Sequence, residues 1–224
     1  GVTATPLQIA SQLEIPLVIY AEHGESEFGG KSLSKKHERE RDINEFLEHL
    51  VGDDPFNWVD DFVDERNLAP YFFPDNNFIK KNKIKAVYFT YFFEWDILKN
   101  YEYVSERINF KTAPGNKSDG TFTNFDSLDD KIDNLYYYMQ MIKFGFGRCV
   151  RDASRHIMYG HITRKEGLDF VKKYDKEFPN TYLGDVLDYL QLNKSELLYY
   201  IDKHRNTEIW KKTGNSWETS FDIK

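Results

Sequence analysis

The chain has 224 residues, of which 40% are hydrophobic and 17% aromatic, and these fractions exclude an intrinsically disordered protein. Its formal net charge of −7 argues against a general nucleic-acid binder, because such a protein needs a positive field over its phosphate-binding surface. The single cysteine, Cys149, excludes an internal disulfide and a cysteine-based zinc site, and we interpret it as a packed thiol rather than a nucleophile.

Residues 1–95 predict part of an α/β layer. Thr5 and Pro6 indicate the start of a helix, because proline suits the first helical position. The short apolar segment IPLVIY at 15–20 predicts a buried strand, and the aromatic and branched residues of AVYFTYFF at 86–93 predict a second strand. A helix followed by an apolar strand is half of an α/β unit, whose ligands gather at the carboxyl ends of strands.

The segment AEHGESEFGG follows the first of these strands. Glu22, Glu25 and Glu27 offer the hard oxygen ligands that Mg²⁺ prefers. Gly29 and Gly30 would let a ligand approach the backbone closely. The alternative interpretation is an acidic, flexible loop, which the composition of the segment alone favours.

Further helices are predicted before residue 110. One runs over 35–51 with a strongly charged first half, and a short one begins at Asp54 and Pro55. Asp96 is placed to cap a third helix, on which Tyr101 and Ile108 are among the residues spaced for burial.

Residues 120–160 predict a helix, a turn broken by glycines, and a second helix. We expect the first helix to begin at Ser127, with Asp130 completing an acidic variant of the capping box. Its apolar face recurs at spacings of three and four, at Leu128, Ile132, Leu135, Met139 and Ile142. Gly145 and Gly147 interrupt the pattern, and the second helix is predicted over Arg148–Tyr159, ending at Gly160.

Three arginines share one face of that second helix. Arg148, Arg151 and Arg155 lie three and four residues apart, with Lys143 just upstream. Clustered guanidinium groups gain most when an oxyanion lies between them, and the first amides of a helix attract anions as well. The alternative is a solvated basic face that is paired with acidic residues. Asp152 is then a partner of Arg148 or Arg155, or else a ligand of a sugar hydroxyl.

The remaining chain predicts helices and one hairpin. Thr163 and Glu166 have the spacing of a capping box. Two more helices are expected over 182–190 and 193–204, and a hairpin is expected to turn at Gly214 and Asn215. No apolar run reaches the length of a membrane span and no signal peptide is visible, so we expect a cytoplasmic protein without membrane insertion.

Several ordered motifs resemble those of the N-acetyl sugar amidotransferases, bacterial enzymes of surface-polysaccharide and lipopolysaccharide biosynthesis. They are TFTNFDSLDDKID, IKFGFGR, DAS, GHITRKEG and VKKYDKEFP, in this order. IPLVIYAEHGESEFGG and YFFEWD are similar to that family as well, so the resemblance covers nearly the whole chain. In YFFEWD, Phe93 stands where the family often has lysine, which weakens a cationic role there.

The resemblance implies a fold from the PP-loop ATP pyrophosphatase superfamily. Residues 1–95 would be an α/β remnant of a PP-loop, adenine nucleotide alpha-hydrolase-like layer, and 96–224 a mainly α-helical substrate or partner domain. The SGGxDS-type loop that holds ATP phosphates in this superfamily does not occur in this sequence. We therefore expect a fragment that begins inside a fold and is inactive by itself.

For the complete enzyme, the resemblance implies conversion of the N-acetyl group of a nucleotide-linked sugar into an acetamidino group. ATP with Mg²⁺ would adenylylate the amide oxygen, and ammonia would then attack the activated carbon. A glutaminase subunit and a cyclase-like ammonia-channel subunit are the implied partners. Neither a nucleic-acid partner nor a membrane-inserted state is implied.

The resemblance also assigns site residues. Glu22, Glu27, Gly29 and Gly30 would lie near ATP and Mg²⁺. A second group would contact the sugar nucleotide, with the cations on its anionic groups: Lys143, Arg148, Arg151, Asp152 and Ser154. No proton-transfer residue and no protein-held metal site is assigned.

Two other functional classes are weighed against this one. The competing class is a non-catalytic helical interaction module that docks the glutaminase and cyclase-like subunits. A metal hydrolase is disfavoured, because the six histidines show no ligand spacing such as HExxH.

Overall fold

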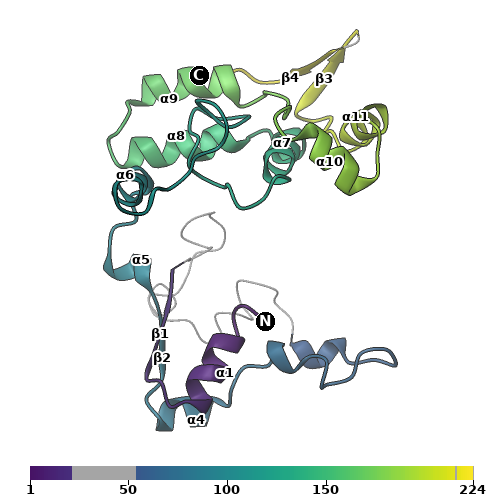
Figure 1. Ribbon diagram of the computed structural model, residues 1–224. Helices are drawn as coiled ribbons and strands as arrows, with labels where there is room; N and C mark the ends of the chain where they lie inside the picture. The colour runs from purple at the N-terminus through teal and green to yellow at the C-terminus, as the bar shows by residue number, and fades with distance from the viewer. Residues whose placement is uncertain (22–53, 215, 224) are drawn as a thin grey trace. The chain divides into compact units, whose positions relative to one another are not determined.

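The computed structural model describes residues 1–21, 54–214 and 216–223. The chain divides into two compact units, Gly1–Trp95 and Asp96–Lys224, and each is described by itself (Figure 1). The helix predicted over 35–51 and the acidic segment with Glu22, Glu27, Gly29 and Gly30 lie outside the described residues.

The first unit contains two strands that pair in parallel. Its elements in chain order are α1 (Thr5–Gln12), β1 (Leu17–Tyr20), the 3₁₀ helices η1 (Pro55–Trp58) and η2 (Ala69–Tyr71), α4 (Asn76–Lys81), β2 (Lys85–Tyr88) and α5 (Phe89–Phe92). The register runs from Leu17 opposite Lys85 to Tyr20 opposite Tyr88. The predicted helix start at Thr5 and Pro6 and the presence of both strands are confirmed. The predicted burial of the first strand is wrong, because Leu17 and Ile19 are exposed.

The second strand is shorter than predicted. It ends at Tyr88, which pairs with the last residue of β1, and residues 89–92 then form the single helical turn α5. Because a strand needs a ladder partner for its backbone groups, the chain turns where β1 stops.

A small core holds the first unit together. Its buried members are Leu7, Ala10, Ile84 and Ala86. They come from α1, from β2 and from the residue before β2, so the helix covers one face of the parallel pair. A helix on a parallel pair is compatible with an α/β layer, and its assignment to the PP-loop superfamily stays a prediction.

The second unit is mainly helical. Its elements are α6 (Ile97–Ile108), α7 (Asp133–Phe144), α8 (Arg148–Met158), α9 (Arg164–Tyr174), α10 (Leu183–Leu190), α11 (Lys194–Lys203), β3 (Trp210–Thr213) and β4 (Ser216–Thr219). Helices α8 and α9 lie side by side (Figure 1). Strands β3 and β4 form an antiparallel hairpin that turns after Thr213, as predicted.

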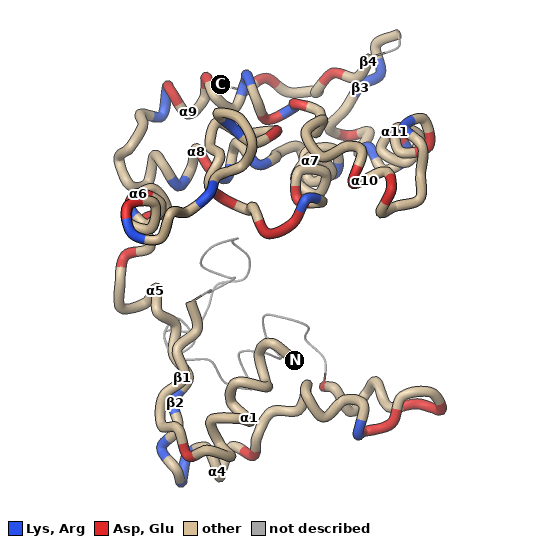
Figure 2. The backbone as a smooth tube through the Cα atoms, viewed as in Figure 1, with Lys and Arg blue, Asp and Glu red and all other residues tan. Residues whose placement is uncertain are grey.

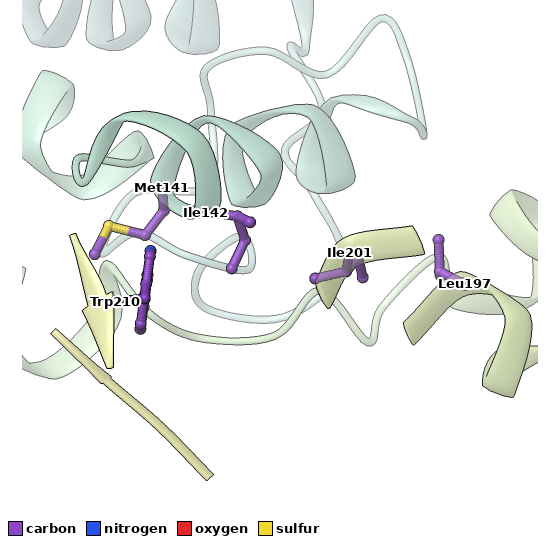
Figure 3. Close-up of a cluster of buried hydrophobic side chains, with 5 residues drawn as sticks. All are labelled: Met141, Ile142, Leu197, Ile201 and Trp210. Carbon is purple, nitrogen blue, oxygen red and sulfur yellow. The ribbon is translucent and has the colours of Figure 1, made fainter. Parts of the chain in front are cut away.

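Two hydrophobic clusters stabilise this unit. One joins α7, α11 and β3 through Met141, Ile142, Leu197, Ile201 and Trp210 (Figure 3). The other packs α8 against α9 through Cys149, Ala153 and Val171. Cys149 is fully buried, and burial, followed by the charges of Asp175 and Asp152, raises the pKa of its thiol. The interpretation of Cys149 as a packed thiol is confirmed.

The predicted start of α7 at Ser127 is wrong. Ser127 has a φ of 55°, in the left-handed region, and its hydroxyl donates to the Asp133 carboxylate. Asp130 accepts from the amide of Ile132, so the polar side chains form a turn instead of a capping box, and α7 begins six residues later, at Asp133.

The other predicted boundaries of this unit lie close to the observed ones. Helix α8 ends at Met158 with Gly160 at a φ of +73°, and the capping box of Thr163 and Glu166 opens α9. The carboxylate of Asp96 caps α6. Within residues 1–21, 54–214 and 216–223, none of the helices combines the length and apolarity that a membrane crossing requires.

Candidate functional site

Helix α8 presents an apolar side to α9 and a charged side to the loop that precedes α7. The charged residues recur at spacings of three and four: Arg148, Arg151, Asp152 and Arg155. Both signs of charge occur along α8 and along the chain that leads into α7 (Figure 2). We call Arg148, Arg151 and Arg155, together with Asp126 and Asp152, the arginine cluster.

Arg148 is an internal residue. Its side chain is 1% exposed, and its guanidinium donates to the side-chain oxygen of Asn134 at 2.9 Å and to the backbone carbonyl of Asp126. Its Nε lies 4.0 Å from the Asp152 carboxylate. Among the described residues the Nε itself has no hydrogen-bond acceptor, so the two hydrogen bonds are what fix the loop and α7 to the first turn of α8.

Arg151 joins three acceptors. Its guanidinium donates to the Asp126 carboxylate and to the Tyr137 hydroxyl, and its Nε donates to Asp152 at 3.2 Å. The Arg151 Cζ also lies 4.5 Å from the centre of the Tyr137 ring, which is a cation–π contact. Burial alone would lower the pKa of Arg151, but the carboxylates of Asp152 and Asp126 raise it overall.

Asp126 is the residue that all three arginines contact. Its carbonyl accepts from Arg148, and its carboxylate accepts from Arg151. The same carboxylate lies 3.7 Å from a guanidinium nitrogen of Arg155, whose side chain is 19% exposed. Asp126 of the loop therefore contacts the charged side of α8 from Arg148 to Arg155.

Asp152 is held by the same loop from the other side. Thr121 and Thr123 both donate hydroxyl hydrogen bonds to its carboxylate, at 2.6 and 3.1 Å. Between them, Phe122 stacks on Phe170 of α9 with 4.4 Å between ring centres. The TFTNFD motif thus alternates hydroxyls toward α8 with a ring toward α9, and it packs the loop over both helices.

The amino terminus of α8 is filled by a carboxylate of the chain itself. Asp175, which follows α9, accepts from the amides of Gly147 at 2.8 Å and of Val150 at 3.2 Å. Burial raises the pKa of Asp175, although hydrogen bonds from these amides oppose the effect. The predicted role of this terminus as a site for an external anion is therefore wrong, because Asp175 supplies the negative charge.

The cluster does not include every residue that the sequence suggested. Lys143 is exposed in the last turn of α7, and in the described part of the chain its ammonium forms no ion pair. Ser154 is exposed and donates to the Val150 carbonyl at 2.7 Å. Arg148, Arg151 and Asp152 are brought together, whereas within the described ranges no side-chain hydrogen bond or ion pair joins Lys143 or Ser154 to them.

Two histidines near α8 were not singled out from the sequence. The Nε2 of His161 lies 2.8 and 2.9 Å from the two oxygens of Asp96, which ties the turn after α8 to the start of α6. His156 is buried against Phe122, and burial lowers its pKa, with the charge of Asp152 opposing. In the sequence, His161 lies within the motif GHITRKEG, but this motif does not indicate that Asp96 is its partner.

Metal binding has no visible basis in the described ranges. Over residues 1–21, 54–214 and 216–223, no three or more histidine, cysteine, aspartate or glutamate side chains are grouped closely enough to hold an ion. Asp126 and Asp152 instead use their oxygens on arginines and threonines.

The fold and the cluster define a helical domain with a charged loop-to-helix network, and comparison with known proteins adds a family. Residues 119–224 match the model of a family described as "LPS biosynthesis protein WbpG-like, C-terminal domain". The matched range contains the whole arginine cluster and the helices from α7 to α11. No curated protein matches the chain. Residues 119–224 are thus similar to the C-terminal domain of lipopolysaccharide biosynthesis proteins.

Proposed function

We propose that this chain is part of an ATP-dependent amidotransferase that converts the N-acetyl group of a nucleotide-linked sugar into an acetamidino group. The family match over residues 119–224 carries the proposal, because it connects the domain with lipopolysaccharide biosynthesis. The ordered motifs that resemble the N-acetyl sugar amidotransferases supply the reaction type.

The reaction balances as an exchange of oxygen for nitrogen. The amide oxygen attacks the α-phosphorus of ATP and pyrophosphate leaves, which makes the amide carbon a better electrophile. Ammonia then adds to that carbon, AMP leaves with the former amide oxygen, and the added nitrogen loses its extra proton. Water has to be excluded, since it would return the activated group to the amide.

The arginine cluster gives this chain a positioning task in the proposed reaction. Arg148 is enclosed and holds the loop, so it acts on a substrate only through its neighbours. Arg151 and the partly exposed Arg155 share the Asp126 carboxylate, and a sugar nucleotide would meet these two arginines there. Asp152 is buried, so it acts on a substrate only through Arg151. The roles of Glu22, Glu27, Gly29 and Gly30 near ATP and Mg²⁺ rest on the sequence resemblance alone.

A second candidate function is docking of partner subunits. Helices α10 and α11 carry exposed tyrosines, namely Tyr189 at 73% and Tyr199 at 63%, with Tyr200 exposed as well. Tyrosines are enriched at protein interfaces because they bury a large ring and keep a polar end. This surface favours an interaction module that binds the glutaminase or the cyclase-like subunit.

The reaction is tested with the protein in the form that the cell makes. It is incubated with ATP, Mg²⁺, ammonium chloride and a set of nucleotide-linked N-acetyl sugars, and the sugars are analysed by mass spectrometry. We expect one sugar to exchange oxygen for NH with release of AMP, because added ammonia replaces the glutaminase. Unchanged sugars, together with stable binding of a purified glutaminase or cyclase-like subunit, would support the docking function instead.

A further inference from the structure

The arginine cluster carries one positive charge that its own carboxylates do not balance. Arg148, Arg151 and Arg155 contribute three positive charges, and Asp126 and Asp152 contribute two negative ones. His156, adjacent to Arg155 in sequence, adds no charge near neutral pH, because burial lowers the pKa of its imidazole. Within the described ranges, the cluster therefore has a net charge of about +1.

Arg155 is the arginine through which the unbalanced charge can reach a ligand. Arg148 donates to two neutral oxygens and its Nε lacks a hydrogen-bond acceptor in the part of the chain that the structure describes, but its side chain is only 1% exposed, so no ligand can reach it. Arg151 already donates to three oxygens. The contact of Arg155 is a 3.7 Å ion pair with Asp126, which Arg151 already uses. Within residues 1–21, 54–214 and 216–223, most of the N–H groups of Arg155 are thus left to donate, although its side chain is only 19% exposed.

Neighbouring groups do not supply the missing negative charge. Asp96 accepts from His161 and from the amides at the start of α6, and Asp175 accepts from the amides at the start of α8. Glu177 is taken by Lys117 and by the amide of Gly120. Each of these carboxylates has its own partners in the described chain.

We infer that the Arg155 guanidinium, beside Arg151, binds a singly charged oxyanion, either a carboxylate or a phosphate diester. A planar guanidinium offers two parallel N–H donors that match the two oxygens of such a group. That this anion is part of a sugar-nucleotide substrate rests on the proposed function. The anion site itself rests on the charges and contacts of the cluster.

Without a bound anion, the side chain of Arg155 lies beside that of Arg151 with little to balance its charge. Arg151 and Arg155 are like charges four residues apart on one helix, a spacing at which they repel each other. Replacing Arg155 with a neutral residue removes this repulsion and breaks only one long ion pair. We therefore expect Arg155→Gln to leave the melting temperature unchanged or to raise it, while it removes the response to anions.

The test compares two charge-matched probes on the full chain. Thermal unfolding is followed with dimethyl phosphate, with acetate, and with sodium chloride at equal ionic strength. At a probe concentration a few-fold above its Kd, the bound anion should raise the Tm of the wild type by about 2–4 °C over the chloride reference. A response to one probe alone identifies the phosphate diester or the carboxylate as the preferred group.

Matched variants decide whether Arg155 is the binding residue. Arg155→Gln should lose the response, and Arg155→Lys should keep a smaller one, because lysine retains the charge without the paired donors. Arg164→Gln makes the same charge change at an exposed position of α9 and should respond like the wild type. The inference is overturned if neither probe exceeds the chloride reference, or if Arg155→Gln responds as Arg164→Gln does. Because no sugar or ATP is needed, these outcomes do not depend on whether the amidotransferase proposal holds.

Discussion

Gly147, the residue directly before α8, has only a hydrogen atom where other residues carry a β-carbon. A β-carbon on Gly147 would lie 2.9 Å from the Asp175 carboxylate and 3.0 Å from the Asp175 carbonyl oxygen. The carboxylate cannot move away cheaply, because it accepts the amides of Gly147 and Val150. At the scale of single residues, this glycine is required by close packing rather than by a ligand.

Gly147→Ala is therefore expected to destabilise the protein by about 1–3 kcal/mol, the usual cost of forcing an extra carbon into a packed site. The measurement is the midpoint of urea unfolding. Gly184→Ala is the control, since nothing lies within 4 Å of a β-carbon there, and in α10 alanine should stabilise by about 0.4–1 kcal/mol. Equal effects of the two changes would contradict the packing account.

At the scale of elements, the sequence predicted the helices better than their polar contacts. The bounds of α8 followed from two glycines and an amphipathic pattern, which act locally. The start of α7 was missed because Ser127 and Asp130 bond within a turn, and the sequence does not show which amide a short polar side chain selects.

The candidate site was predictable only in part, for a similar reason. Helical spacing placed Arg148, Arg151 and Asp152 on one face, as the structure has them. Asp126 and Tyr137, which the arginines contact, come from other segments, and no periodicity within α8 reveals them. Contacts between distant segments depend on tertiary packing, so the sequence offered pairing with acidic residues only as an alternative and did not single out Asp126 as the partner.

The buried face of α8 predicts a pH dependence of stability. Burial lowers the pKa of His156, so the folded state favours the neutral imidazole; the charged groups near it are Asp96, Asp126, Asp152 and, when protonated, His161. In the unfolded chain histidine has a pKa of about 6.5 and binds a proton first. The stability that His156 contributes is thus present above about pH 6.5 and is lost as the pH falls through its lowered folded pKa.

We expect the free energy of unfolding to decrease over this acidic range in the wild type, and to decrease less in His156→Gln. Urea unfolding at a series of pH values measures both. His204→Gln changes an exposed histidine and should keep the wild-type slope. If the free energy of unfolding of His156→Gln changes with pH as steeply as that of the wild type, the burial of His156 does not cause the pH dependence.

At the scale of the whole molecule, the family match and the compact unit begin at different residues. The match starts at residue 119, whereas the second unit starts at Asp96. Residues 96–118, which the match does not cover, contain α6. This helix is joined to the matched part by the contact between His161 and Asp96. The Tyr101 ring also stacks on Phe125, with 4.3 Å between ring centres. Helix α6 is therefore a structural part of this unit.

A polypeptide of residues 96–224 should fold cooperatively by itself, since it contains both hydrophobic clusters of the second unit. A polypeptide of residues 119–224 should be less stable by roughly 2 kcal/mol or more, because it lacks the hydrogen-bonded contact between His161 and Asp96 and the aromatic stack. Urea unfolding of the two polypeptides measures the difference. Equal free energies of unfolding would show that α6 does not stabilise the second unit.

Asp126, Arg148 and Arg151 form one energetic unit that holds the loop on α8. A double-mutant cycle of Asp126→Asn and Arg151→Gln, followed by urea unfolding, measures the coupling between two of its members. We expect a coupling energy of about 1.5–3 kcal/mol, as for a hydrogen bond between charged groups that are mostly shielded from water. A coupling energy near zero, the value for independent positions, would show that the two residues do not act together.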